Sequence, residues 1–184
     1  MTTYETAHQI LNEIDQVLAR VDEAEIQALC DEIQGARRIV VYAMGREGLV
    51  MRSFAMRLMH LGLSLAVVGD MTTPPVGPGD LFLVACGPGY VSTTQALMGV
   101  AREAGARIAM VTAQPQAPLP QQADLLVYLP GQTMAEAENS SSVQAMGSVF
   151  EQSMWILFDA LVPRLQQSLG QTTDDLRARH TNLE

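Results

Sequence analysis

Two glycine-containing turns could bind the polar or anionic part of a small ligand. The first, Gly45-Arg46-Glu47-Gly48, follows an apolar run that starts at Ile39, and the second, Gly87-Pro88-Gly89, follows the apolar run 81–85. Each turn is followed by apolar residues at helical spacing, which predicts a strand, a tight turn and a helix. In open α/β sheets the first N–H groups of such helices face the crevice that binds ligands. The pair of turns therefore predicts an anion or polyol site; the simpler alternative is a fold that turns twice on glycine.

Two titratable side chains lie in apolar helical stretches and are candidates for acid–base chemistry. Glu151 is flanked by Val149-Phe150 and Met154-Trp155, in a setting where carboxylates seldom lie unless they are paired or catalytic. The alternative is a polar stripe that Glu151 shares with glutamine and serine residues of the same helix. His60 also follows an apolar run, where a histidine is more often a core residue bonded to the backbone than a catalytic one.

Cationic and hydroxyl side chains near the first turn could contact a substrate. Arg46, Arg52 and Arg57 cluster around this turn and the helix after it. They could neutralise an anionic ligand, or pair with surface acids as most arginines do. Thr73 precedes Pro74 in a loop, where its hydroxyl could bind a ligand or cap the turn.

Composition narrows the class of protein. The chain has 184 residues, 48% of them apolar, which is enough for the core of a single domain. A formal net charge of −9 argues against nucleic acid and acidic membranes as partners. No apolar stretch is long enough to span a membrane, and the N-terminus does not look like a signal peptide, so a cytoplasmic location is expected. Two cysteines and three scattered histidines give no metal-ligand pattern.

Hydrophobic periodicity predicts alternating strands and helices. An N-terminal helical segment, 1–34, has a break near Asp22, and a charged tail, 168–184, ends the chain. The predicted strands start at Ile39 and cover 64–68, 81–85, 107–111 and 125–129; the later helices cover 49–62, 92–104 and 143–165, with a polar loop at 130–142. This alternation predicts an α/β fold, a single doubly wound parallel sheet flanked by helices in a flavodoxin-like three-layer arrangement.

Four blocks along nearly the whole chain carry a family resemblance. They are Phe54-Ala55-Met56-Arg57-Leu58-Met59-His60-Leu61-Gly62, Val68-Gly69-Asp70 with Thr73-Pro74-Pro75, Gln144-Ala145-Met146-Gly147-Ser148-Val149-Phe150-Glu151-Gln152, and the ending Arg179-His180-Thr181-Asn182-Leu183-Glu184. With these blocks in order, the chain resembles the SIS (sugar isomerase) domain family, and within it the 6-phospho-3-hexuloisomerases of the ribulose monophosphate pathway.

The resemblance implies an activity and a set of site residues. It implies a homotetramer that uses neither metal nor cofactor and converts a hex-3-ulose 6-phosphate to fructose 6-phosphate through an enediol. Glu151 would be the base, and His60 an acid or a partner for ring opening. Arg46 and Thr73 would contact the substrate, and His180, on the tail, would reach the site of a neighbouring subunit.

The two turns depart from the family's pattern. The family usually has Gly-Arg-Ser-Gly at the first turn, where this chain has Glu47 in place of the serine. The family's second turn usually reads Ser-Gly-Ser-Gly-Glu-Thr, where this chain has Cys86, Gly87, Pro88, Gly89, Tyr90 and Val91. Pro88 has no N–H to donate, and Glu47 adds a negative charge where the family binds phosphate.

Three readings follow from this departure. In the first, which we favour, the substrate is a sugar phosphate and Ser92 and Thr93, with backbone amides and an arginine, replace the missing phosphate contacts. In the second, the substrate lacks a phosphate and Glu47 and Tyr90 hold its hydroxyls. In the third, the domain binds a sugar without catalysis. The retained Glu151 argues against the third reading, because a binding protein has no need of a base in an apolar setting.

Overall fold

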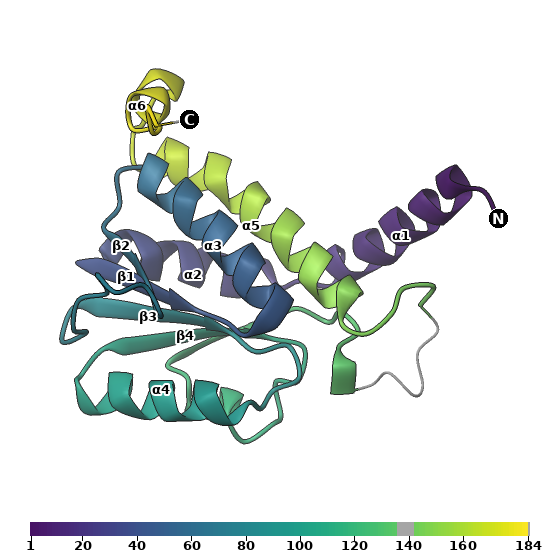
Figure 1. The fold of residues 1–184 in the computed structure, drawn as a ribbon, viewed down its shortest axis with the longest axis horizontal. Coiled ribbons are helices and arrows are strands. Elements are labelled where there is room, and N and C mark those ends of the chain that lie inside the picture. Colours follow the sequence, from purple (N-terminus) through teal and green to yellow (C-terminus); the bar gives the residue numbers. More distant parts are fainter. Residues whose placement is uncertain (136–141, 184) are drawn as a thin grey trace.

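A parallel five-stranded sheet forms the centre of the computed structural model, which describes residues 1–135 and 142–183. The strands are β1 (Arg38–Tyr42), β2 (Leu65–Val67), β3 (Asp80–Ala85), β4 (Arg107–Thr112) and β5 (Leu125–Tyr128). Their order in the sheet is β2-β1-β3-β4-β5, and every neighbouring pair is parallel. The predicted doubly wound parallel sheet is confirmed (Figure 1).

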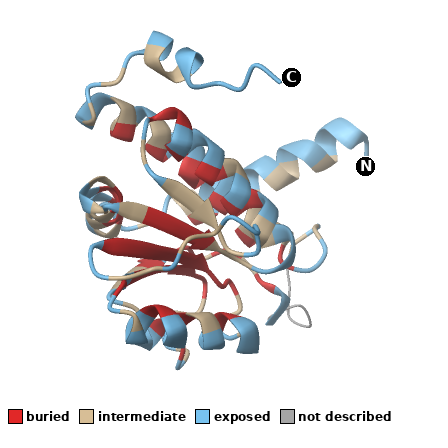
Figure 2. Ribbon diagram, turned by 60° about the vertical axis from the view of Figure 1, so that its left-hand side comes forward, coloured by how far each residue is buried: buried red, intermediate tan, exposed pale blue. Residues whose placement is uncertain are grey.

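Helices cover both faces of this sheet, which explains why its strands read as continuous apolar runs. All six residues of β3 are buried. One apolar layer joins the sheet to α2 (Glu23–Gly35), α3 (Gly45–His60) and α5 (Ser148–Ser168), and a second joins it to α4 (Ser92–Glu103). Figure 1 shows α4 below the sheet and α3 and α5 above it, and Figure 2 shows buried residues concentrated in the strands between the layers. Strands enclosed on both faces need apolar side chains at successive positions.

The N-terminal segment forms two helices, as predicted. Helix α1 (Thr3–Leu18) begins with a capping box in which Thr2 and Glu5 bond reciprocally. Asp22 caps the start of α2, at the predicted break. The second half of α1 packs on α5 through Ile14 and Val17, while its first half projects from the body of the protein (Figure 1).

Two helices begin several residues away from their predicted starts, and the structure adds two short elements. Helix α3 begins at Gly45 instead of Leu49, so the first glycine turn is itself the start of the helix. Helix α5 begins at Ser148 instead of Val143, because Met146 adopts a positive φ of 58° and Gly147 caps the helix. The charged tail contains a further short helix, α6 (Thr173–Ala178), which starts with a capping box at Thr172. A 3-10 turn, η1 (Pro120–Gln122), precedes β5. Part of the polar loop predicted at 130–142 lies outside the described residues.

Within the described part of the chain, no helix has the length and apolar character needed to cross a membrane.

Candidate active site

The two glycine turns lie side by side, because β1 and β3 are neighbours in the sheet. Glu47, in the first turn of α3, reaches across to the second turn. Its two carboxylate oxygens lie 3.2 and 3.1 Å from the backbone nitrogen of Gly87, which donates to them. A Cβ at Gly87 would lie 2.8 Å from Glu47 Oε1 and 2.8 Å from a ring carbon of Phe150. Glycine is therefore required at this position for the two turns to approach this closely.

Helix α5 brings a second carboxylate to the same place. The Glu151 carboxylate accepts a hydrogen bond from Arg46 Nη1 at 2.6 Å, and the same nitrogen lies 3.1 Å from Ser148 Oγ. The Glu151 side chain is 16% exposed and that of Arg46 is 51% exposed. Arg46 thus holds the carboxylate in a defined orientation at the edge of solvent.

Between these turns lies a cleft of about 250 Å³. Its lining residues come from the starts of α3, α4 and α5, the end of β3 and the loop before α5: Met44, Gly45, Arg46, Glu47, Ala85, Cys86, Pro88, Val91, Thr94, Thr133, Met134, Gly147, Phe150 and Glu151. Thr94 as a whole is 1% exposed, and among the described residues its buried Oγ1 has no hydrogen-bond partner. A buried hydroxyl without a partner at a cleft wall is a group that a polar ligand could satisfy.

The three helices that start at this cleft all lack a side-chain N-cap. Their N-cap residues are Met44, Val91 and Gly147, and none makes a side-chain capping hydrogen bond. Helices α1, α2 and α6, which start elsewhere, are each capped by a Thr or Asp side chain. Uncapped helix N-termini present N–H groups and positive dipole ends, which favour an anion or an oxygen-rich ligand.

Acidic groups near the second turn have altered proton affinities. Burial is the main cause that raises the pKa of Glu47 to about 7; the bond from Gly87 N–H opposes this shift and the charge of Glu151 adds to it. Burial, reinforced by the charge of Glu47, raises the pKa of the Cys86 thiol to about 12. Cys86 is therefore a neutral thiol at physiological pH, and Glu47 exchanges a proton close to neutrality.

A family model described as the SIS domain matches residues 32–155, which include both turns, the cleft and all five strands of the sheet. The chain belongs to the SIS domain family.

Relatives of this SIS domain include proteins named 3-hexulose-6-phosphate isomerase. The chain is 34% identical over 185 residues to the one from Bacillus subtilis (strain 168), with 100% of both chains covered. It is 38% identical over 175 residues to the one from Mycobacterium gastri, covering 95% of this chain and 88% of that one. A solved structure of a hypothetical protein from Methanococcus jannaschii, with that same function inferred in its description, matches with a TM-score of 0.81 and 27% identity, covering 97% of each chain.

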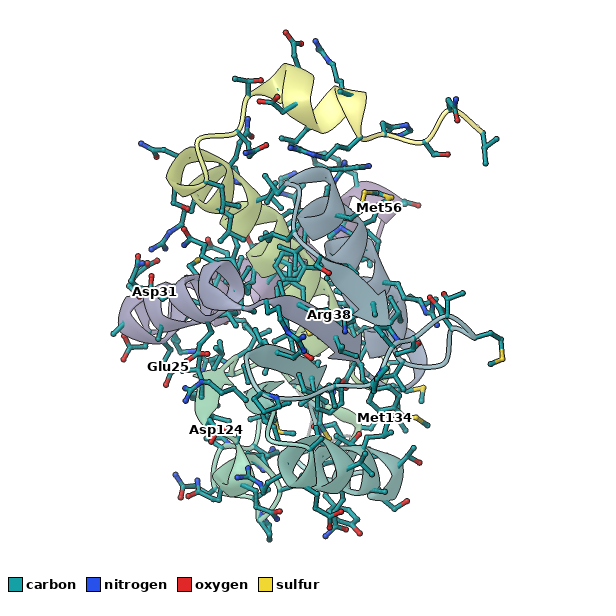
Figure 3. The ribbon with its side chains drawn as sticks, turned by 90° about the vertical axis from the view of Figure 1, so that its left-hand side faces the viewer. Glu25, Asp31, Arg38, Met56, Asp124 and Met134 are labelled. Atoms are coloured by element: carbon teal, nitrogen blue, oxygen red, sulfur yellow. The ribbon has the colours of Figure 1, made fainter. Side chains whose placement is uncertain are left out.

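Two predicted site residues of this SIS domain lie together, but at the other end of α3 from the cleft. The rings of His60 and His180 stack with centroids 5.3 Å apart, and Arg179 donates to the His60 carbonyl at 2.8 Å. Figure 3 shows the C-terminal segment lying over this end of α3, on which Met56 is labelled. The 16 residues of α3 span about 22 Å, so within one chain His60 and Glu151 are far apart.

Thr73 belongs to neither cluster. Its hydroxyl lies 2.6 Å from the carbonyl of Val67 and 2.7 Å from that of Asp70, so it caps the turn after β2. It lines a separate cleft beside β2 and α3, not the one that contains Glu151. The structure thus matches the capping alternative for this hydroxyl within one chain.

On α4, the residue that faces the cleft is Thr94, whereas the predicted contacts Ser92 and Thr93 are exposed. Sequence reasoning missed Thr94, although helical spacing placed it on the same face as Met98 and Ala101, which are both buried. Gly89, also a predicted contact, adopts a φ of 76°, which serves the turn itself. Within residues 1–135 and 142–183, no group of three or more His, Cys, Asp and Glu side chains is placed to hold a metal ion.

Proposed function

We propose that this SIS-domain protein is a ketose isomerase that converts a hex-3-ulose 6-phosphate to fructose 6-phosphate without a metal or cofactor. The observation that carries this proposal is the Glu151 carboxylate, held by Arg46 at a cleft formed by three uncapped helix N-termini. Two relatives that match nearly the whole chain are named for this reaction. A single carboxylate base and a site for an oxygen-rich anion are what the reaction requires.

The reaction moves one proton between adjacent carbons. The Glu151 carboxylate takes the proton from C2 of the hexulose, and the electron pair forms the C2–C3 double bond while negative charge develops on the C3 oxygen. The proton on the C2 oxygen then leaves, the C3 oxygen is protonated, and Glu151 returns its proton to C3 as the C2 carbonyl forms. The guanidinium of Arg46 has further N–H donors that could stabilise the enediolate oxygens.

The phosphate would bind where the helices start. Free N–H groups at the starts of α3 and α4 and the Thr94 hydroxyl supply donors, with exposed Ser92 and Thr93 at the rim. A positive helix end attracts a phosphate without needing a dedicated lysine.

His60, His180 and Thr73 would act in an assembled oligomer, which we propose to be a homotetramer. Beside Arg46 and Glu151 lies a groove of about 360 Å³ between α1, α3 and α5, with Leu49, Trp155 and Ile156 in its walls. These three side chains are 63%, 42% and 47% exposed. A second subunit that covers this groove could place its own tail near the cleft, which one chain alone does not do.

A second candidate substrate is a sugar without a phosphate. The observation in its favour is the Glu47 carboxylate, which already accepts the Gly87 N–H that an anion would use. In that case Glu47 would bind a hydroxyl group instead.

The direct test is deuterium exchange into fructose 6-phosphate in D₂O, followed by NMR. A C2–C3 enediol exchanges the proton on C3 and leaves the protons on C1 in place, so the position of the label reports the chemistry. We expect Glu151→Gln to slow this exchange by about 10²–10⁴-fold, the usual contribution of a positioned base. Glu103→Gln, an exposed change on α4, is the matched control and should exchange at the native rate. Native-rate exchange in Glu151→Gln would remove Glu151 from the mechanism.

A further inference from the structure

Glu47 occupies the position at which the second turn offers its N–H group. Both of its carboxylate oxygens lie within hydrogen-bond distance of the Gly87 nitrogen, inside the cleft that Glu151 and Thr94 also line. An anionic ligand at this turn would have to compete with a carboxylate of the protein itself.

The charged and titratable groups around Glu47 do not compensate its charge. Helix α3 contributes Arg46, whose guanidinium is bonded to Glu151 of α5. Cys86, which directly follows β3, is a neutral thiol, and beyond it Tyr42 of β1 interacts electrostatically with Cys86 and has a pKa that burial raises above its usual value. Among the described residues no ion pair includes Glu47. An incoming phosphate dianion would therefore meet two carboxylates and one guanidinium.

We propose that a sugar phosphate binds in this cleft together with one proton taken up by Glu47, which makes Glu47 the residue that sets the pH range of phosphate binding. A neutral Glu47 removes one of the two repulsive charges, releases the Gly87 N–H to the ligand, and gains an O–H that can donate to a phosphate oxygen. The proton comes from solvent and returns to it when the ligand leaves. This inference rests on the proposed function, because it takes a sugar phosphate as the substrate.

The proposal gives a definite pH dependence. The raised pKa of Glu47, about 7, keeps a proton available near neutral pH, whereas an ordinary glutamate would be fully ionised there. Phosphate monoesters lose their second proton near pH ~6, so the ligand is already a dianion above pH ~7. A ligand that requires protonated Glu47 then loses about tenfold in affinity for each pH unit above pH ~8.

The experiment is calorimetric titration with fructose 6-phosphate between pH 6.5 and 9, in buffers that differ in ionisation enthalpy. For the native protein we expect uptake of close to one proton per bound ligand above pH 8, and a Kd that rises about tenfold per pH unit. In Glu47→Gln the uptake should vanish and the Kd should stay flat over this range. Glu103→Gln, the exposed control on α4, should behave as the native protein does.

The outcomes separate this inference from the proposed function. Binding at all pH values with a flat Kd and no proton uptake overturns the role of Glu47, while deuterium exchange at C3 would still support the isomerase. Absence of binding and of exchange at pH 6.5 overturns both. Proton uptake is measured on the native protein, so the result stands even if Glu47→Gln does not fold.

Discussion

Gly131 lies against the first turn of α5, the turn that positions Glu151, and a methyl group there should disturb both stability and catalysis. A Cβ at this position would lie 2.7 Å from Cα, 3.0 Å from N and 3.2 Å from Cβ of Phe150. To reach the ~3.4 Å of ordinary van der Waals contact, the shortest of these distances must grow by about 0.7 Å. The backbone must make this shift, because the nearest atom is the Cα of Phe150. Glu151 follows Phe150 directly, so its carboxylate shifts with it relative to Arg46.

We expect Gly131→Ala to lower the free energy of unfolding by about 1–3 kcal/mol, the usual cost of overpacking. For a chain of this size each kcal/mol corresponds to about 2–4 °C in Tm. A displacement of this order in a catalytic group lowers turnover by about 10–100-fold, because proton transfer depends on the position of the base. Differential scanning fluorimetry measures the first effect and deuterium exchange into fructose 6-phosphate the second.

Gly99→Ala is the matched control for this change. A Cβ at Gly99 meets nothing within 4 Å, and the residue is exposed in the interior of α4. Alanine should therefore stabilise the helix by about 0.5–1 kcal/mol and leave turnover unchanged. A Gly131→Ala protein with native Tm and native exchange rate would refute the claim that this close approach positions Glu151.

Three further predictions concern charge and assembly. The native state holds the Glu47 proton more tightly than the unfolded chain does, because burial raises the pKa of Glu47. The free energy of unfolding, measured by urea titration, should therefore fall by on the order of 1–3 kcal/mol as the pH rises from 4.5 to about 7. Glu47→Gln should lack this fall. Arg37→Met removes two hydrogen bonds from the fully buried Asp80 carboxylate and should lower the free energy of unfolding by about 1–3 kcal/mol. Adding Asp80→Asn to the same chain should restore part of this loss. An unchanged Tm in Arg37→Met would contradict the prediction. If His60 serves the site of another subunit, refolding equal amounts of inactive Glu151→Gln and His60→Ala chains together should regenerate about a quarter of the sites. No recovery would contradict a role of His60 at the site of another subunit.

Much of the fold was readable from local patterns. The apolar run that starts at Ile39 and the run 81–85 each predicted a strand followed by a glycine turn, and the structure has both. That the two strands are neighbours in the sheet came only from the structure. The start of α5 was predicted wrongly, because the apolar and polar residues after Val143 fit a helix by composition. The positive φ of Met146 and the cap at Gly147 break that helix, and no periodicity signals either.

The site residues divide in the same way. Glu151 and Arg46 were candidates by residue type, and the structure brings them together. Thr94 was missed because the prediction chose Ser92 and Thr93, the two hydroxyl residues next to the turn. In the structure the third residue of α4, Thr94, lines the cleft. Thr73 was chosen as a loop hydroxyl, and its environment directs that hydroxyl to backbone carbonyls.

The sequence by itself determined the family, the alternation of strands and helices, and the identity of the groups that could do chemistry. These follow from hydrophobic period, glycine placement and residue type, which are local properties of the chain. Only the tertiary structure decided that Arg46 bonds Glu151, 105 positions away, and that Glu47 reaches Gly87, 40 positions away. Such pairings depend on the order of the strands in the sheet and on how closely the helix ends approach one another. These segments meet only after folding, so no local sequence pattern specifies the distance between them.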